Sequence, residues 1–259
     1  VFQQQMLSKR YGKESILVNQ MTPSVDESCL QKKYNKIKII WVANFKELKH
    51  PELFVQLAKD LKGHSDRIEM YMCGRSTSKY NNLLQDLNHI DYLNYLGSLD
   101  QEQVFDLMNE AHILVNTSEY EGFSNTFVQA WMRKVVVVSM NSNPSDILTS
   151  QGIGFLTPNM TNLVATIHKL IEHPEIISEL GEKSYQYYID NHSIVNTTKN
   201  LLKAIDECSL DYRSYNEIKG TLPIPCENKN IFLKCFFFDA ESAITVSNCA
   251  NYLGKNLAT

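Results

Sequence analysis

The stretch HILVNTSEYEGFSNTFVQAWMRKVVVVS, residues 112–139, contains two short apolar runs with a polar loop and a helix-like segment between them. The runs HILVNT and VVVVS have the length and nearly continuous apolar character of strands that are covered on both faces. The segment NTFVQAWMRK between them is predicted to be a helix. Strand, loop, helix and strand in this order predict a βαβ unit of a parallel sheet.

The same alternation extends in both directions from this stretch. Further strands are predicted at residues 37–43, 67–73 and 92–96. Two amphipathic helices are predicted, at 50–62 with Pro51 in its first turn and at 99–111 with Asp100 as its cap. We therefore expect an α/β fold with a doubly wound, Rossmann-like parallel sheet, in which ligands bind at the carboxyl ends of the strands.

The domain organisation follows from where this pattern stops. We predict a Rossmann-like domain at residues 36–207, preceded at 1–35 by a short helix and a polar linker. Residues 208–259 contain a proline-rich turn and the apolar run IFLKCFFF, and they do not fit the alternation. That tail is left unassigned.

Composition limits the classes of function. The 259 residues carry a formal charge of −4, which gives no reason to expect bulk attraction to nucleic acid or to anionic lipid. No apolar run reaches the roughly 20 residues that cross a bilayer. The six cysteines form no Cys-x-x-Cys pair and have no histidine at zinc-ligand spacing, which favours a reduced, cytoplasmic protein. Contact with the inner face of a membrane would at most be peripheral.

The loop and helix start at residues 121–130, EGFSNTFVQA, carry the polar chemistry. A helix that begins near Asn125 presents unpaired N–H groups and a positive dipole end, which favour a phosphate. Gly122 allows close approach of the backbone to a ligand, and Ser124, Asn125 and Thr126 add hydrogen-bond donors.

Two side chains flank these donors and suit hydroxyl groups instead. Glu121 would repel a phosphate, but its carboxylate can accept hydrogen bonds from hydroxyls. Gln129 lies in the first turns of the helix, where it can bond a diol. A nucleotide sugar has this combination of groups. The local pattern leaves a second interpretation open, in which Ser124 and Asn125 simply cap a helix and Glu121 is a solvated loop acid.

The string EGFSNTFVQA resembles the E-G-F-x-N-x-x-x-E-A motif of family-4 type retaining GT-B glycosyltransferases, through Glu121, Gly122, Phe123, Asn125 and Ala130. Other blocks resemble the same family in its order along the chain, including IIWVANFKELKHPELF at 39–54 and YLNYLGSLDQEQVFDLMNEAHILVNTSEYEGF at 92–123. The resemblance covers roughly residues 1–207. It implies that the chain is the C-terminal, donor-binding half of a GT-B enzyme.

The resemblance also implies residue roles. It assigns Glu121 to the donor sugar as the catalytic residue and Lys49 to the diphosphate, and it includes Phe123 in the donor site. This sequence departs from the family at two site positions. The second acid of the motif is Gln129, which is expected to meet the ribose with less charge-assisted strength. The arginine that neutralises the diphosphate is replaced by Asn44, for which Lys46 is an imperfect substitute.

We therefore expect a hexosyltransferase-type glycosyltransferase of polysaccharide biosynthesis that moves a sugar from a nucleoside diphosphate to a carbohydrate or lipid-linked acceptor with retention. No Asp-x-Asp occurs, so the diphosphate is expected to need no metal and the enzyme no cofactor. A non-catalytic nucleotide-sugar-binding or scaffold module is the alternative, which the departures at Asn44 and Gln129 favour; a sugar-nucleotide epimerase is a distant third. Since little precedes the linker, an N-terminal acceptor domain is expected to be missing, with residues 1–35 as its remnant plus the linker, and this chain alone is expected to be incomplete.

Overall fold

The computed structural model describes residues 2–12, 15–20, 22 and 25–219. They divide into two compact units, one of residues 25–189 and one that contains the described residues before 25 and after 189. The predicted boundaries at residues 36 and 207 stay a prediction.

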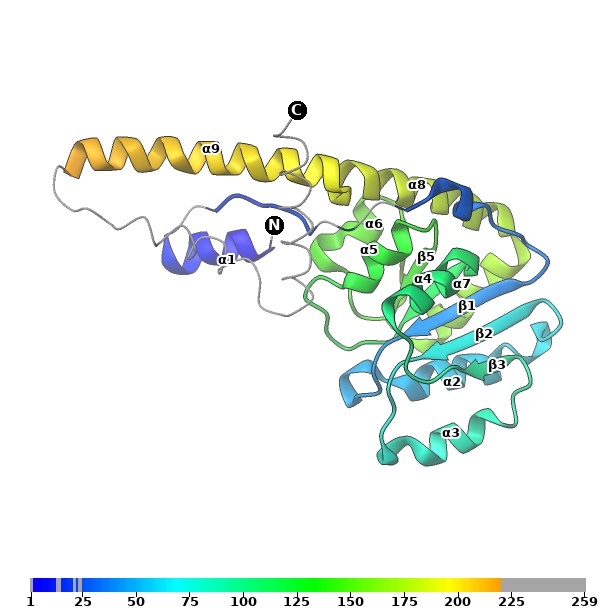
Figure 1. The fold of residues 1–259 in the computed structure, drawn as a ribbon. Helices are drawn as coiled ribbons and strands as arrows, with labels where there is room; N and C mark the ends of the chain where they lie inside the picture. Colours follow the sequence, from blue (N-terminus) through cyan, green and yellow to red (C-terminus); the bar gives the residue numbers. More distant parts are fainter. Residues whose placement is uncertain (1, 13–14, 21, 23–24, 220–259) are drawn as a thin grey trace. The chain divides into compact units, whose positions relative to one another are not determined.

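The larger unit contains a six-stranded sheet in which every neighbouring pair is parallel (Figure 1). The order β3-β2-β1-β4-β5-β6 confirms the predicted doubly wound, Rossmann-like fold. The strands are β1 (Ile37–Val42), β2 (Ile68–Cys73), β3 (Leu93–Tyr95), β4 (Ile113–Asn116), β5 (Val136–Ser139) and β6 (Gly154–Leu156). The helices that follow them are α2 (Pro51–Asp60), α3 (Asn81–Leu87), α4 (Gln101–Glu110), α5 (Asn125–Trp131), α6 (Ile147–Ser150), α7 (Met160–Glu172) and α8 (Pro174–His192), whose last residues lie beyond the unit.

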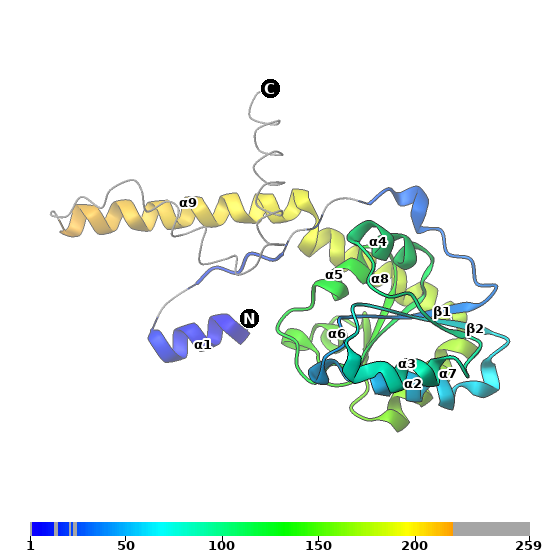
Figure 2. The same cartoon turned by 60° about the horizontal axis from the view of Figure 1, so that its bottom comes forward.

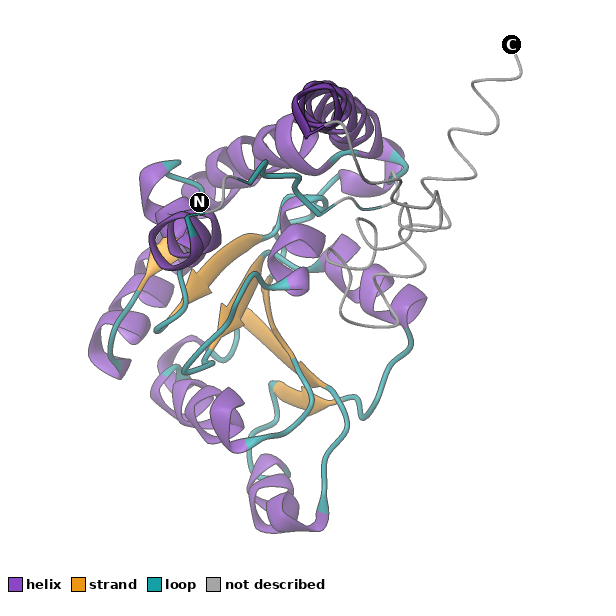
Figure 3. Ribbon diagram, turned by 90° about the vertical axis from the view of Figure 1, so that its left-hand side faces the viewer, coloured by secondary structure: helices purple, strands orange, loops and turns teal. Residues whose placement is uncertain are grey.

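Both faces of the sheet are covered, as the continuous apolar runs predict. On one face, Ile39 and its equivalents in the other strands pack against α2, α3 and α7. On the other face, Ile40, Leu114 and Val137 pack against α4, α5, α6 and α8. Figure 2 shows these helix layers on opposite sides of the strands, and Figure 3 shows the strands between them.

The helix starts follow the local sequence signals. Pro51 occupies the first turn of α2. Asp100 caps α4 by accepting from the Gln103 N–H at 2.9 Å, and the Gln103 side chain accepts in return from the Asp100 N–H at 3.0 Å. The Asp100 cap satisfies donors that a helix start leaves unpaired, and Pro51 has no N–H to leave unpaired, so these two predictions are confirmed.

The smaller unit contains helix α1 (Phe2–Tyr11) and helix α9 (Ile194–Lys219). Its first and last segments meet at a bridge between Thr22 and Ser193, and the His192 Nδ1 lies 2.8 Å from the Gln20 carbonyl oxygen. The sequence predicts a helix at residues 193–208, and residues 194–208 form the first part of α9, which extends to Lys219. Residues 220–259, which contain most of the unassigned tail, lie outside the described residues.

Candidate functional site

The predicted site residues gather at the point where the strand order reverses. β1 pairs with β2 on one side and with β4 on the other, although β4 comes third after it in the chain. The segment after β1, residues 43–50, leads to α2, and the segment after β4, residues 117–124, leads to α5. In open parallel sheets, such a switch point is where ligands bind.

Lys49 and Glu121 meet across this switch point. The Lys49 Nζ forms an ion pair with the Glu121 Oε1. The Ser118 hydroxyl donates to the same oxygen at 2.8 Å. The two charged side chains are only 26% and 16% exposed, so the pair is partly shielded from solvent and from salt. A cation and a carboxylate thus lie together at the end of the sheet.

The segment that carries Lys49 has an unusual backbone. Residues 47–49 form a 3₁₀ turn, and His50 follows in the left-handed region with φ 46° and ψ 57°. Left-handed backbone is uncommon for a residue other than glycine, and a following proline disfavours the helical region at this position. Pro51 comes next, so the turn bends sharply where the chain enters α2.

The Asn44 side chain forms a hydrogen bond with the segment that follows β2. Its Oδ1 accepts from the Arg75 N–H at 2.9 Å, and the Phe45 N–H donates to the Arg75 carbonyl at 2.9 Å. The approach is close because Gly74 has φ +141° and a Cβ there would lie 1.8 Å from the Ala43 oxygen. Asn44 is exposed at the carboxyl end of β1, where the prediction placed it.

The start of α5 lies where the sequence predicts it, with Ser124 at the N-cap position. The Ser124 hydroxyl lies 2.7 Å from the Thr126 hydroxyl and does not cap the helix. A Cβ at Gly122 would have no atom within 4 Å, so the backbone there is open to a ligand. The Phe123 side chain is 38% exposed and its ring lies 6.3 Å from that of Trp131. Asn125 and Gln129 are half-buried and lie four residues apart on α5, which places them on one side of the helix.

Sequence reasoning missed Ser118, Thr117 and Arg75. Each is a polar residue one or two positions after a strand, and no motif singles it out. The only signal available was its position, because the residues that follow parallel strands share one edge of the sheet.

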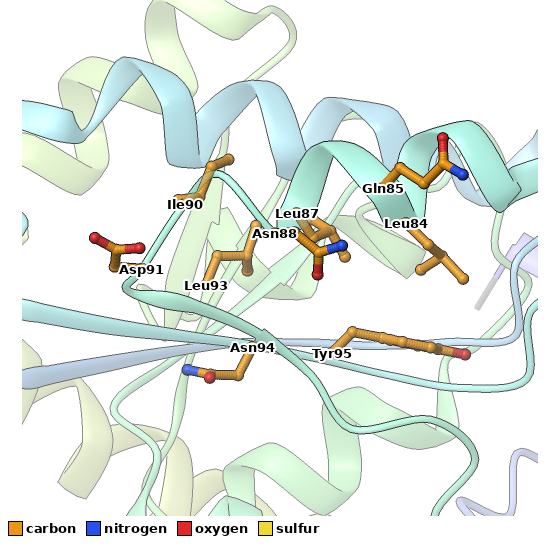
Figure 4. Close-up of a pocket in the computed structure, with 9 residues that line it drawn as sticks. All are labelled: Leu84, Gln85, Leu87, Asn88, Ile90, Asp91, Leu93, Asn94 and Tyr95. Carbon is orange, nitrogen blue, oxygen red and sulfur yellow. The ribbon is translucent and has the colours of Figure 1, made fainter.

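Two surface hollows lie away from this site. One of about 530 Å³ lies between α3 and β3 and is lined by residues such as Leu84, Ile90 and Tyr95 (Figure 4). The other, of about 880 Å³, has a mixed charged lining that includes Lys36, Lys62 and Asp91. Neither contains a predicted donor-binding residue, so the chemistry at the switch point defines the candidate site.

Neither a membrane-spanning helix nor a metal-binding cluster of three or more His, Cys, Asp or Glu side chains is found within residues 2–12, 15–20, 22 and 25–219. The metal-independent reaction and the cytoplasmic location stay predictions.

Comparison with known proteins gives one family. The model of the family described as "Glycosyl transferases group 1" matches residues 27–187, which include both loops of the site. No curated protein sequence matches the chain.

Solved structures with a similar fold include three of particular use. A TarM variant from S. aureus, in complex with fondaparinux, alpha-GlcNAc-glycerol and UDP, has a TM-score of 0.65 at 17% identity; the match covers 78% of this chain and 42% of that one. The pneumococcal O-GlcNAc transferase GtfA, in complex with UDP and GlcNAc, has a TM-score of 0.61 at 17% identity, with coverage of 80% and 42%. The C-terminal domain of LpcC, a glycosyl transferase group 1 family protein from Francisella tularensis, has a TM-score of 0.53 at 16% identity, with coverage of 63% and 95%. The chain thus spans less than half of the first two structures.

Proposed function

This chain belongs to the glycosyl transferases group 1 family, and on that premise we propose that it is the donor-binding half of a retaining, family-4 type GT-B glycosyltransferase. The observation that carries the proposal is the Lys49–Glu121 pair at the switch point. It brings a cation suited to a diphosphate and an acceptor suited to sugar hydroxyls to one place, beside the start of α5.

The proposed roles follow from the chemistry of each group. Lys49 neutralises the diphosphate, and backbone N–H groups near Ser124 and Asn125 add donors to it. Glu121 accepts hydrogen bonds from the sugar, and Gln129 contacts the ribose. When the bond between the anomeric carbon and the diphosphate oxygen breaks, its electrons stay on the diphosphate. Lys49 then stabilises more negative charge than before, which lowers the barrier to transfer without a metal ion.

The rest of the reaction would need a second half. The acceptor hydroxyl oxygen forms the new bond to the anomeric carbon, and its proton passes to the departing diphosphate oxygen. A site that excludes water and aligns this hydroxyl requires a wall opposite the switch point. The TarM and GtfA structures are more than twice as long as the matched part of each. We propose that an N-terminal domain supplies the wall, that the acceptor is a carbohydrate or lipid-linked, and that the transferred group is a hexose.

A binding module without catalysis is the second candidate. It is favoured by Asn44, whose amide oxygen holds the Arg75 N–H where the family has a cation, and by the neutral Gln129. Such a module would still hold a nucleotide sugar through Lys49 and Glu121.

Calorimetric titration tests the proposal. UDP, GDP, ADP and the glucose conjugate of each are titrated into the chain, with uridine, guanosine and adenosine as controls. We expect one base to be preferred and the diphosphate to bind much more tightly than its nucleoside. A site that binds none of the nine compounds contradicts the proposal.

Turnover tests whether the chain itself catalyses bond cleavage. Slow release of glucose from the bound conjugate, with the anomer identified by NMR, supports a transferase half, and an unchanged anomer supports retention. Tight binding with no release over the same time is expected of the binding module and also of a donor half that needs its N-terminal domain for catalysis.

A further inference from the structure

Thr117, the first residue after β4, joins the two loops of the site. Its side chain is completely buried. The hydroxyl oxygen lies 2.8 Å from the Trp41 Nε1 and 2.5 Å from the Lys49 carbonyl oxygen. One side chain therefore connects the end of β4, the indole on β1 and the main chain of the residue that carries the site's cation.

The direction of both hydrogen bonds is fixed by the groups involved. An indole N–H can only donate and a carbonyl oxygen can only accept. The Thr117 hydroxyl must therefore accept from Trp41, which is 2% exposed, and donate its single proton to Lys49. Hydrogen bonds in such a chain strengthen one another, and removing the hydroxyl leaves a buried donor and a carbonyl without their partner.

A second contact holds the same segment. The Glu119 N–H donates to the Leu48 carbonyl at 2.8 Å. Leu48 and Lys49 are thus attached to Glu119 and Thr117, and Glu121, the partner of the Lys49 ammonium, follows two residues later. The backbone from which the Lys49 side chain extends is fixed relative to the loop that carries Glu121.

We propose that Thr117 is the positioning residue of this site, which holds the Lys49 main chain so that its ammonium meets the diphosphate beside Glu121. This inference rests on the proposed function, since it assigns a diphosphate to Lys49. Thr117 itself contacts no substrate. Its hydroxyl sets where the cation lies, and so it determines how much of the affinity for a nucleotide comes from the diphosphate.

Thr157 provides a matched control for the ordinary role of a buried threonine. It lies directly after β6, is 2% exposed, and its hydroxyl donates to the Ser139 carbonyl at 3.2 Å. It occupies the same kind of position at the end of a strand, and its hydroxyl bonds β5 rather than either loop of the site. A loss that comes from removing any buried hydroxyl at a strand end should therefore appear in both variants, although Thr157→Val removes one hydrogen bond, whose acceptor keeps a bond from the Thr157 N–H, and Thr117→Val removes two.

The test compares Thr117→Val, Thr117→Ser and Thr157→Val in the 259-residue chain, with UDP and uridine as the probes. We expect Thr117→Val to raise the Kd of UDP about tenfold, which corresponds to about 1.4 kcal/mol, and to leave that of uridine within about twofold. Thr117→Ser, which keeps the hydroxyl, and Thr157→Val should each leave the Kd of UDP within about twofold. Equal losses for Thr117→Val and Thr157→Val would overturn the proposal.

Hydrogen exchange measured by NMR gives a readout that does not depend on nucleotide binding. In Thr117→Val, the Trp41 indole N–H and the Glu119 amide should exchange at least about tenfold faster than in the wild type, while Thr157→Val leaves both unchanged. If the wild type binds no nucleotide but these changes occur, the proposed function fails while the coupling of the loops stands. If exchange at Glu119 is unaffected by Thr117→Val, the positioning role is wrong even if nucleotides bind. Should Thr117→Val not fold, Thr117→Ala replaces it in both measurements.

Discussion

The Lys49 ammonium is bonded to the Glu121 carboxylate across the ends of β1 and β4, although 72 positions separate the two residues in the sequence. Removing one partner of a shielded pair leaves the other charge without compensation, which costs more than an exposed pair gains. The nucleotide would have to share Lys49 with Glu121 or take its place. Replacing Lys49 or Glu121 one at a time should therefore have different effects on nucleotide binding.

Lys49→Ala should weaken the binding of UDP far more than the binding of uridine. Loss of a charge-assisted bond costs roughly 1.5–3 kcal/mol, on the order of ten- to a hundredfold in affinity. The uncompensated Glu121 carboxylate would then also repel the diphosphate. Calorimetry measures both ligands. Lys59→Ala is the control, because it removes an equal charge from a surface pair with Asp86 at 3.2 Å and should change neither Kd.

Glu121→Gln should abolish discrimination between UDP-sugars that differ in the configuration of one hydroxyl, such as UDP-glucose and UDP-galactose. The affinity for UDP itself should not fall. The amide removes the negative charge that faces Lys49, so the affinity for the diphosphate should rise rather than fall. Competition between the two UDP-sugars measures the preference. Glu119→Gln is the control for a loop carboxylate two residues away. A sugar preference that survives Glu121→Gln would show that another residue reads the sugar.

Gln129→Glu should raise the affinity for UDP several-fold, because a carboxylate accepts hydrogen bonds from a ribose diol more strongly than an amide does. The gain should be absent for 2′-deoxy-UDP, which lacks one of the two hydroxyls. The two Kd values are compared in the wild type and the variant. An equal change for both nucleotides would mean that Gln129 does not face the ribose.

Removal of divalent metal ions should leave the affinity for UDP unchanged. Lys49 and backbone N–H groups are proposed to take the diphosphate charge, so no metal bridge is needed. Titrations in EDTA and in magnesium chloride check this expectation. A large loss of affinity in EDTA that magnesium restores would assign part of the diphosphate charge to a metal.

Acid should destabilise the fold through His112. Burial, reinforced by the charge of Lys32, lowers the pKa of His112 to about 4, and its Nδ1 accepts from the Lys38 N–H at 2.9 Å. The unfolded chain, with a histidine pKa of about 6.5, binds the proton more readily between these values. The contribution of His112 to stability is therefore complete above about pH 6.5 and falls as the pH drops towards 4, by about 3 kcal/mol at most.

Denaturant unfolding at pH 7 and pH 4.5 measures this loss. His112→Asn, which keeps an acceptor near the Lys38 N–H but cannot take up a proton, should reduce the difference between the two pH values. His89→Asn removes an exposed histidine and should leave the difference unchanged. A pH dependence that is the same in His112→Asn and in the wild type would contradict the assignment to His112.

The sequence by itself determined the strands and helices whose environment is uniform. Ile37–Val42 and Val136–Ser139 are apolar on both faces because helices cover both faces, so burial is visible in the residues themselves. The first-turn position of Pro51 and the Asp100 cap are equally local. Strand β6 was missed, because Gly154–Leu156 has three residues and a glycine that packs closely against the Val137 carbonyl, which is not a strand pattern.

Only the tertiary structure decided which polar residues meet. The motif around Glu121 and the match of Lys49 to the family's lysine were visible in the sequence. The contact between Lys49 and Glu121 depends on β4 lying beside β1, which the order of the strands sets. The bonds from Thr117 to Lys49 and from Arg75 to Asn44 have the same origin: each joins a residue shortly after one strand to a partner after another strand that chain folding brings near. Hydrogen bonds require a specific distance and direction, and a single polar letter in the sequence carries neither.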